Sequence, residues 1–243
     1  MTGLKSGSSG AWPGRRVILT WLFMALLSVA ASMALGERMR RGVFDSWQTL
    51  SPRDLSSSDV RVVMIDDKSI ETLGPWHWPR YYLARLTEQL ANSGATVIAY
   101  DMVFSEHDRV SPETFASLYP ELGSAAAAEV KALQPMDQVF SQVIGSAPVV
   151  LAHAGVEEAP AGQPPLADAP VRGKLPPHVD GWPAELAAIP ELDDVAVGHG
   201  LINVRPDSDG VIRAVPLVMR TGGKPRPGFA AEIARNALKS EAI

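Results

Sequence analysis

The sequence predicts an α/β fold in which a mixed, mainly parallel sheet is flanked by helices and preceded by one transmembrane helix. Two short runs of mostly β-branched residues, Val60–Ile65 and Ala95–Tyr100, enclose one helix-forming segment, which is typical of a β-α-β unit. A third apolar run follows at Pro148–Ala152. An uncharged stretch of 20 residues, Val17–Gly36, precedes all three runs.

Composition limits the class of protein. The 243 residues are 46% hydrophobic and 20% charged, which fits a globular chain rather than a disordered one. The formal net charge is −5, so no nucleic-acid partner is expected, because phosphate contacts require clustered Lys and Arg. The chain contains no cysteine, which excludes disulfides, thiol catalysis and zinc–thiolate sites.

The N-terminal part of the chain is expected to hold a membrane anchor. Residues 1–16 are rich in Gly and Ser and are interpreted as a disordered cytoplasmic tail. As a helix, residues 17–36 would be roughly 30 Å long at about 1.5 Å per residue, the thickness of a bilayer core. A cleavable signal peptide, with the small residues Ser32 and Ala34 near its end, is the alternative. Both interpretations place residues 37–243 outside the cytoplasm.

The β-α-β unit is predicted from its turn and proline residues and from the spacing of its apolar residues. A short helix is expected over Ser69–Leu73, followed by a turn, and Pro79 suits the first turn of the next helix. Leu83, Leu86 and Leu90 recur at spacings of three and four, so they share one face of that helix. Two strands joined through a helix are expected to be parallel, with a right-handed crossover.

Further helices, two β-like runs and a long irregular segment follow. Eight prolines between residues 155 and 190 disfavour regular structure, and such a segment serves as a lid, a binding loop or a surface wrap. The runs His199–Val204 and Val211–Met219 flank an Asp-Gly turn, which indicates an antiparallel hairpin. Helices are expected at Pro112–Tyr119, Ser124–Leu133, Pro135–Ile144, Ala184–Ile189 and Gly228–Lys239.

Two aspartates follow the first two predicted strands directly. If these strands are neighbours, Asp66 and Asp101 lie side by side at the sheet edge where α/β proteins bind ligands. Two carboxylates so close require a cation, a proton or hydrogen bonds. Three interpretations stay open: an ion pair with Arg80, a divalent metal, or a ligand-contacting cluster. Asp67 is interpreted as the N-cap of the short helix.

Two other groups of residues attract attention. Trp76 and Trp78, between two prolines, form either an aromatic floor for a ligand or a rigid plug at one end of the sheet. The sequence Asp207-Ser208-Asp209-Gly210 resembles the start of a calcium loop but lacks its closing glutamate, so a simple turn is the commoner explanation. Arg213 is expected to pair with Asp209 or Asp207.

Taken together, these motifs resemble the CHASE2 domain, an extracytoplasmic sensory module of bacterial transmembrane receptors. The resemblance covers residues from about Phe44 to Leu238. The motifs that carry the resemblance are Val62–Ser69, Leu73–Arg80, Gly94-Ala95, Tyr100–Phe104 and Asp209–Arg213. Each motif alone is a weak indication of the family, but all of them in this order are specific.

The resemblance implies a receptor sensor. It implies a membrane span at residues 17–36, a sensor domain at 37–243 in the periplasm or outside the cell, and localisation at the bacterial inner membrane. Family outputs are nucleotide cyclases, diguanylate cyclases, histidine kinases and serine/threonine kinases. The chain reaches Ile243 without an output domain, so a fragment or signalling in trans is expected.

The leading expectation is therefore a signal-sensing domain that is not an enzyme. It acts as a homodimer, binds a small-molecule or protein signal, and needs no cofactor or bound metal. An assembly role, in which residues 155–190 bind another protein, is the alternative. A metal-dependent hydrolase using Asp66 and Asp101 is disfavoured because no general base is evident. The expected ligand-contacting residues are Asp66, Trp76, Trp78, Arg80 and Asp101, with Asp209 and Arg213 as weaker candidates.

Overall fold

The computed structural model describes residues 14–53, 59–163 and 166–243. The chain divides into two compact units, Met1–Met64 and Ile65–Ile243. Of the disordered tail predicted at residues 1–16, residues 1–13 lie outside the described residues, whereas Arg15 and Arg16 begin the first helix.

Unit 1 contains one long helix, α1, from Arg15 to Leu50. It does not end at Gly36 but continues through a charged segment, in which Glu37 pairs with Arg40 at 2.6 Å and with Arg41 at 3.2 Å. In the described part of the chain, no helix combines the length and apolar character needed to cross a membrane. The transmembrane helix predicted at residues 17–36 is therefore not confirmed.

The first predicted strand is wrong. Residues 60–65 form no strand, and the side chains of Val60, Val62 and Met64 are exposed. A β-branched run becomes a strand only where a neighbouring strand pairs with it, and the pairing partner found for β1 among the described residues is β2. The expected placement of Asp66 and Asp101 at two adjacent strand ends is therefore wrong as well.

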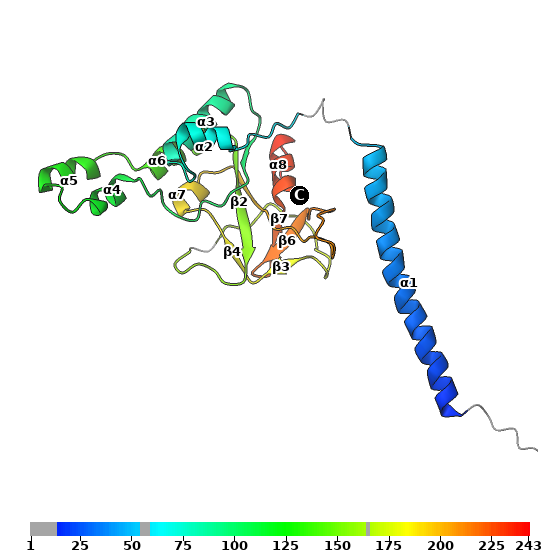
Figure 1. Cartoon of the computed structure of the whole chain (residues 1–243). Helices are drawn as coiled ribbons and strands as arrows, with labels where there is room; N and C mark the ends of the chain where they lie inside the picture. Colours follow the sequence, from blue (N-terminus) through cyan, green and yellow to red (C-terminus); the bar gives the residue numbers. More distant parts are fainter. Residues whose placement is uncertain (1–13, 54–58, 164–165) are drawn as a thin grey trace, which may run out of the picture. The chain divides into compact units, whose positions relative to one another are not determined.

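Unit 2 holds two small mixed sheets, and β2 runs through the middle of the first (Figure 1). In the first sheet β2 pairs in parallel with β1 and β5, and antiparallel with β4. In the second sheet β6 pairs in parallel with β3 and antiparallel with β7. The prediction of one mainly parallel sheet is thus corrected to two mixed sheets. The strands are β1 (Ile98–Tyr100), β2 (Val149–Val156), β3 (Gly181–Trp182), β4 (Ala184–Leu186), β5 (Gly198–Leu201), β6 (Val218–Thr221) and β7 (Lys224–Pro227).

Helices flank these sheets, which confirms the mixed α/β class. The main core lies where α3 and α6 cover one face of the first sheet, with Leu83, Phe140 and Ile144 against Val149 and Leu151. All five of these side chains are almost fully buried. The helices are α2 (Asp67–Leu73), α3 (Arg80–Asn92), α4 (Pro112–Leu118), α5 (Ser124–Lys131), α6 (Met136–Ser146), α7 (Pro190–Asp193) and α8 (Phe229–Ala237).

Two further sequence predictions are wrong. The run at residues 184–189 is not a helix, because Ala184–Leu186 pairs with β2 instead. The hairpin around residue 210 does not form, because β5 joins β2 and the described backbone at residues 211–217 carries no strand. The turn itself is present, with Gly210 N–H donating to Asp207 O at 2.8 Å.

Helix α8 packs closely on β5, at two glycines. A Cβ added to Gly198 would lie 2.0 Å from Glu232 Oε1, and one added to Gly200 would lie 2.5 Å from Phe229 Cα. Since side chains alternate along a strand, His199 between them projects from the opposite face. The Gly-His-Gly sequence therefore allows helix contact on one face and a polar side chain on the other.

Gly200→Ala is expected to lower the free energy of unfolding by about 3 kcal/mol, because the new methyl group meets helix backbone that cannot rotate away. Urea unfolding followed by circular dichroism measures this change. Gly145→Ala is the matched control, since its Cβ would meet Val195 Cβ at an ordinary 3.6 Å and alanine favours the helix. Equal stability of the two variants would contradict the close contact between α8 and β5.

Candidate functional site

Three of the predicted site residues line one small cavity. Trp76, Trp78 and Arg80 border a space of about 300 Å³ together with Phe104 and Asp108. This space is called the tryptophan cavity below. Its lining combines aromatic rings with a buried guanidinium, so the sequence motif does assemble into a compact local structure.

Arg80 forms an ion pair, but its partner is not one of the predicted aspartates. Its Nε lies 3.4 Å from Asp137 Oδ1 of α6, and its guanidinium lies 4.5 Å from the centre of the Phe104 ring. Its backbone N–H donates to Asp108 Oδ2 at 2.6 Å, which caps α3 from a distant loop. The predicted bridge to Asp66 or Asp101 is replaced by this pair, because α6 packs against α3 and brings Asp137 to the helix start.

The tryptophans are held in place by the fold. Trp78 is buried and donates its Nε1–H to Gly74 O at 2.7 Å. Trp76 packs against the main core and meets Trp78 edge-on, with ring centroids 5.6 Å apart. The plug interpretation accounts for these contacts, while the role of either tryptophan in binding a ligand stays a prediction.

Asp66 and Asp101 occupy exposed positions on unit 2. Asp66 Oδ1 accepts from Ser69 Oγ at 2.6 Å and from Ser69 N–H at 2.8 Å. Asp66, not Asp67 as predicted, is therefore the N-cap of α2. The hydrogen bond from the Ser69 hydroxyl lowers the pKa of Asp66 below its ordinary value. Asp101 follows β1 directly.

Asp209 and Arg213 form a local pair at the predicted turn. Arg213 Nη2 lies 2.8 Å from Asp209 Oδ2, and its Nη1 lies 2.7 Å from Asp207 Oδ2. The hydrogen bond from Arg213 is the main reason why the pKa of Asp209 falls to about 2. The guanidinium thus occupies carboxylate oxygens that a calcium loop would offer, which supports the turn interpretation.

A second, larger cavity lies beside the first sheet and contains none of the predicted site residues. Its volume is about 700 Å³. It is called the histidine cavity below. The ionisable side chains that line it are His153, Asp168, Glu185, Asp193, Asp194, His199, Arg226, Glu232 and Arg235.

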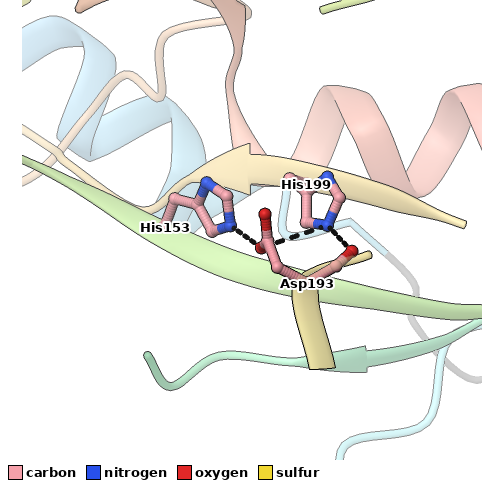
Figure 2. Close-up of side chains that lie close together, drawn as sticks. All are labelled: His153, Asp193 and His199. Atoms are coloured by element: carbon pink, nitrogen blue, oxygen red, sulfur yellow. Dashed lines mark hydrogen bonds and ion pairs between the residues drawn. The ribbon is translucent and has the colours of Figure 1, made fainter. Parts of the chain in front are cut away.

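The sheet register brings two histidines of this cavity together. Leu151 of β2 pairs with His199 of β5, so His153 and His199 project from the same face of the sheet. Their rings stack with centroids 4.7 Å apart. The carboxylate of Asp193, the last residue of α7, faces the Nε2 edges of both rings (Figure 2). Its neighbour Leu192 is buried in the main core and holds this short helix in place.

Asp193 contacts both histidines. Its Oδ1 lies 2.7 Å from His153 Nε2 and 3.3 Å from His199 Nε2. The backbone carbonyl of Asp193 lies 3.0 Å from His199 Nε2. His153 is 2% exposed, whereas Asp193 and His199 are partly exposed, so the cluster is buried at one end and accessible at the other.

Glu185 extends the cluster on the buried side. Its Oε1 lies 2.7 Å from His153 Nδ1, and its Oε2 accepts from Arg226 Nε at 2.9 Å. The Thr221 hydroxyl also donates to Oε2. Glu185 on β4, Thr221 on β6 and Arg226 on β7 therefore join the two sheets through one buried polar network.

The buried network shifts the pKa values of its members. Burial alone would lower the pKa of His153, but the hydrogen bonds to Asp193 and Glu185 outweigh it and raise that pKa above the usual 6.5. Burial would raise the pKa of Glu185, but the hydrogen bonds from His153 and Thr221 and the charge of Arg226 lower it. Burial lowers the pKa of His199.

Stability is expected to fall as the pH rises above 6.5. A histidine whose pKa is raised by folding contributes its full stabilisation below the unfolded pKa and loses it as the pH rises through the folded pKa. His199 has a lowered pKa, so its contribution has the opposite sign: it makes stability rise with pH, mainly below 6.5, and does not produce the decline. Urea unfolding at a series of pH values should show the decline in the wild type and not in His153→Gln. A decline of equal size in the variant would assign it to other groups.

The sequence contained a signal for this site that residue type alone did not reveal. His153 and His199 each interrupt a buried apolar run between two small residues, Ala-His-Ala and Gly-His-Gly. A histidine inside a buried strand requires polar partners. Which partners it finds depends on Asp193 and Glu185, which lie 40 and 32 residues from His153 in the sequence.

The fold and the cavity define an α/β domain with a polar site of a size suited to a small ligand. The family model of the CHASE2 domain matches residues 18–243, nearly the whole chain, so the chain belongs to the CHASE2 domain family, as its motifs indicated. This is a family of extracellular sensory domains, which supports a sensor role. Neither a curated protein nor a solved structure gives a significant match.

Proposed function

We propose that this chain senses an extracytoplasmic signal by binding it in the histidine cavity, and that binding is coupled to a cyclase or kinase output of a membrane receptor. One observation carries the proposal: a cavity of about 700 Å³ combines a buried polar network with an accessible edge at Asp193 and His199. Membership of a sensory family agrees with it.

The size and chemistry of the cavity suit a small polar molecule. Sites for such ligands typically measure about 300–1,000 Å³ and carry a few convergent polar groups. Glu185 and Arg226 satisfy one another at the buried end. Asp193 and His199, which are partly exposed, are the groups best placed to meet a ligand.

Described residues between 155 and 190 line this cavity, among them Gln163, Ala167 and Pro170. Gln163 Nε2 donates to Glu185 O at 2.9 Å, and Arg226 Nη1 donates to Ala167 O. A ligand that shifts His153 or Glu185 would therefore change contacts of this segment and of the second sheet. Such a change gives two arrangements of the domain, which is what coupling to an output requires.

These contacts favour sensing over the assembly role. Gln163 and Ala167 of this segment line the cavity, so the segment does not serve only as an outer surface. Its exposed residues, Glu157 and Glu158 among them, are available to another protein. A crosslinked partner that is lost in a Glu157→Ala, Glu158→Ala double variant would favour assembly.

A thermal-shift screen of the full chain against small organic acids, amino acids and nucleobases, in the presence of EDTA, tests the proposal. A binding compound should raise the melting temperature of the wild type and of Trp76→Phe, and should lose at least tenfold in affinity with His199→Ala. Trp76→Phe is the control because Trp76 lines the tryptophan cavity. Loss of binding in Trp76→Phe alone would move the site to that cavity, and the absence of any binding compound would remove small-molecule sensing.

A further inference from the structure

Three donor atoms from three different elements converge at the accessible edge of the histidine cavity. They are His153 Nε2 on β2, His199 Nε2 on β5 and Asp193 Oδ1 at the end of α7, and they all lie within 4.8 Å of one another. Figure 2 shows the two rings and the carboxylate turned toward a common point. The fold therefore positions two imidazole nitrogens and one carboxylate oxygen as a set.

The protonation of the other ring nitrogen of His153, Nδ1, follows from its hydrogen-bond partner. Nδ1 lies 2.7 Å from Glu185 Oε1, and a carboxylate only accepts, so Nδ1 carries a proton. Asp193 Oδ1, 2.7 Å from Nε2, also only accepts, so Nε2 carries a proton as well. A cation that binds at Nε2 takes the place of that proton.

The charges around the site are consistent with such an exchange of a proton for a cation. Glu185 and Asp193 carry two negative charges, and Arg226 supplies one positive charge at Glu185. The remaining negative charge, at Asp193 beside two imidazole rings, is balanced by the proton on His153 Nε2 or by a cation in its place. A carboxylate that orients a histidine from behind is the usual outer partner of a metal-ligating imidazole.

We propose that His153, Asp193 and His199 bind a divalent first-row transition cation, with Zn²⁺ as its representative. Two imidazoles and one carboxylate suit zinc better than calcium or magnesium, which prefer oxygen ligands. Donors around a tetrahedral zinc ion, with bonds of about 2.0–2.1 Å, lie about 3.3 Å apart. The His199–Asp193 distance of 3.3 Å already fits, while the His153–Asp193 distance of 2.7 Å must widen slightly.

The site leaves a fourth coordination position on the side of the cavity. Since Asp193 and His199 are partly exposed, an ion has a path to the three donors. Three protein ligands with one open position are typical of zinc sites that exchange an external ligand. This inference deepens the proposed function, on which it rests, because it names the cation as the signal that the cavity binds.

Calorimetric titration of the EDTA-stripped full chain with ZnCl₂ tests the inference. The wild type should bind one equivalent and show a raised melting temperature. His199→Ala and Asp193→Asn should weaken binding at least 100-fold, and Glu185→Gln should weaken it about 10- to 100-fold, as loss of an outer partner does. His178→Ala, which removes an exposed histidine elsewhere, should bind as the wild type does.

Spectroscopy gives a second measurement that does not depend on affinity. Co²⁺ in place of Zn²⁺ should produce the visible absorption of a tetrahedral site in the wild type and lose it in Asp193→Asn, whose folding is checked by circular dichroism. Absence of zinc binding to the folded wild type, or equal binding by His199→Ala, would overturn the metal site. The metabolite screen contains EDTA, so a compound lost with His199→Ala but without zinc binding would refute the metal and leave the proposed function standing.

Discussion

Arg226→Ala is expected to destabilise the domain by about 3–5 kcal/mol, because it leaves the Glu185 carboxylate buried without its guanidinium partner. Arg226 is 8% exposed and Glu185 is 7% exposed, and their atoms lie 2.9 Å apart. The variant also deprives Ala167 O of its donor. Urea unfolding of the full chain measures the change.

The matched control is another arginine in an ion pair, but on the surface. Arg172 lies 3.1 Å from Glu241, and both side chains are mostly exposed. Because water screens such pairs, Arg172→Ala is expected to cost less than about 1 kcal/mol. Adding Glu185→Gln to Arg226→Ala should recover part of the lost stability, since it removes the buried carboxylate charge that has lost its guanidinium partner. A small effect of Arg226→Ala would mean that the network is not closed as described.

The helices of unit 2 were largely predictable because their signals are local. Proline before α3 and leucines at spacings of three and four need no information about the rest of the chain. Helix α3 therefore appears where expected, and the prolines at residues 112 and 135 mark the starts of α4 and α6 within one residue. Only the run at residues 184–189 was assigned to a helix and proved to be a strand.

The strands were less predictable because a strand depends on its partner. Residues 60–65 have a more regular β-branched pattern than β5, yet β5 pairs with β2 and residues 60–65 form no strand. The glycines of β5 weaken its β propensity, but they allow α8 to approach its other face. Neither the pairing of β5 with β2 nor the packing of α8 on β5 can be read from the local composition of the sequence.

The candidate site shows the same difference between features encoded locally and features that depend on distant contacts. The residues around Arg80 were singled out because several unusual residues stand together in the sequence. The histidine cavity was missed because its polar groups come from β2, β4, α7, β5 and β7. Only the register of Leu151 with His199 reveals that the two histidines share a face.

Arg80→Ala is the second substitution with a large expected effect, about 3 kcal/mol of lost stability. Arg80 is 9% exposed and Asp137 is 5% exposed. Among the described residues, Arg80 Nε and Asp137 Oδ1 have no hydrogen-bond partner, so at 3.4 Å they are held by charge attraction alone. Removal of the guanidinium leaves the Asp137 charge buried and also removes the cation above the Phe104 ring.

Arg85→Ala provides the control on the same helix, because Arg85 is exposed and pairs with Glu88 at the surface. It should change stability by less than about 0.5 kcal/mol. Arg80→Lys should fall between the two, since it keeps the charge but loses the planar group that donates to Glu106 O. If Arg80→Ala leaves stability unchanged, Asp137 does not depend on Arg80, and the arginine is free to meet a ligand. The expected result is that Arg80→Ala destabilises the domain while the folded Arg80→Lys variant still binds compounds. In that case the residues around Arg80 serve a structural role, and the signal binds elsewhere.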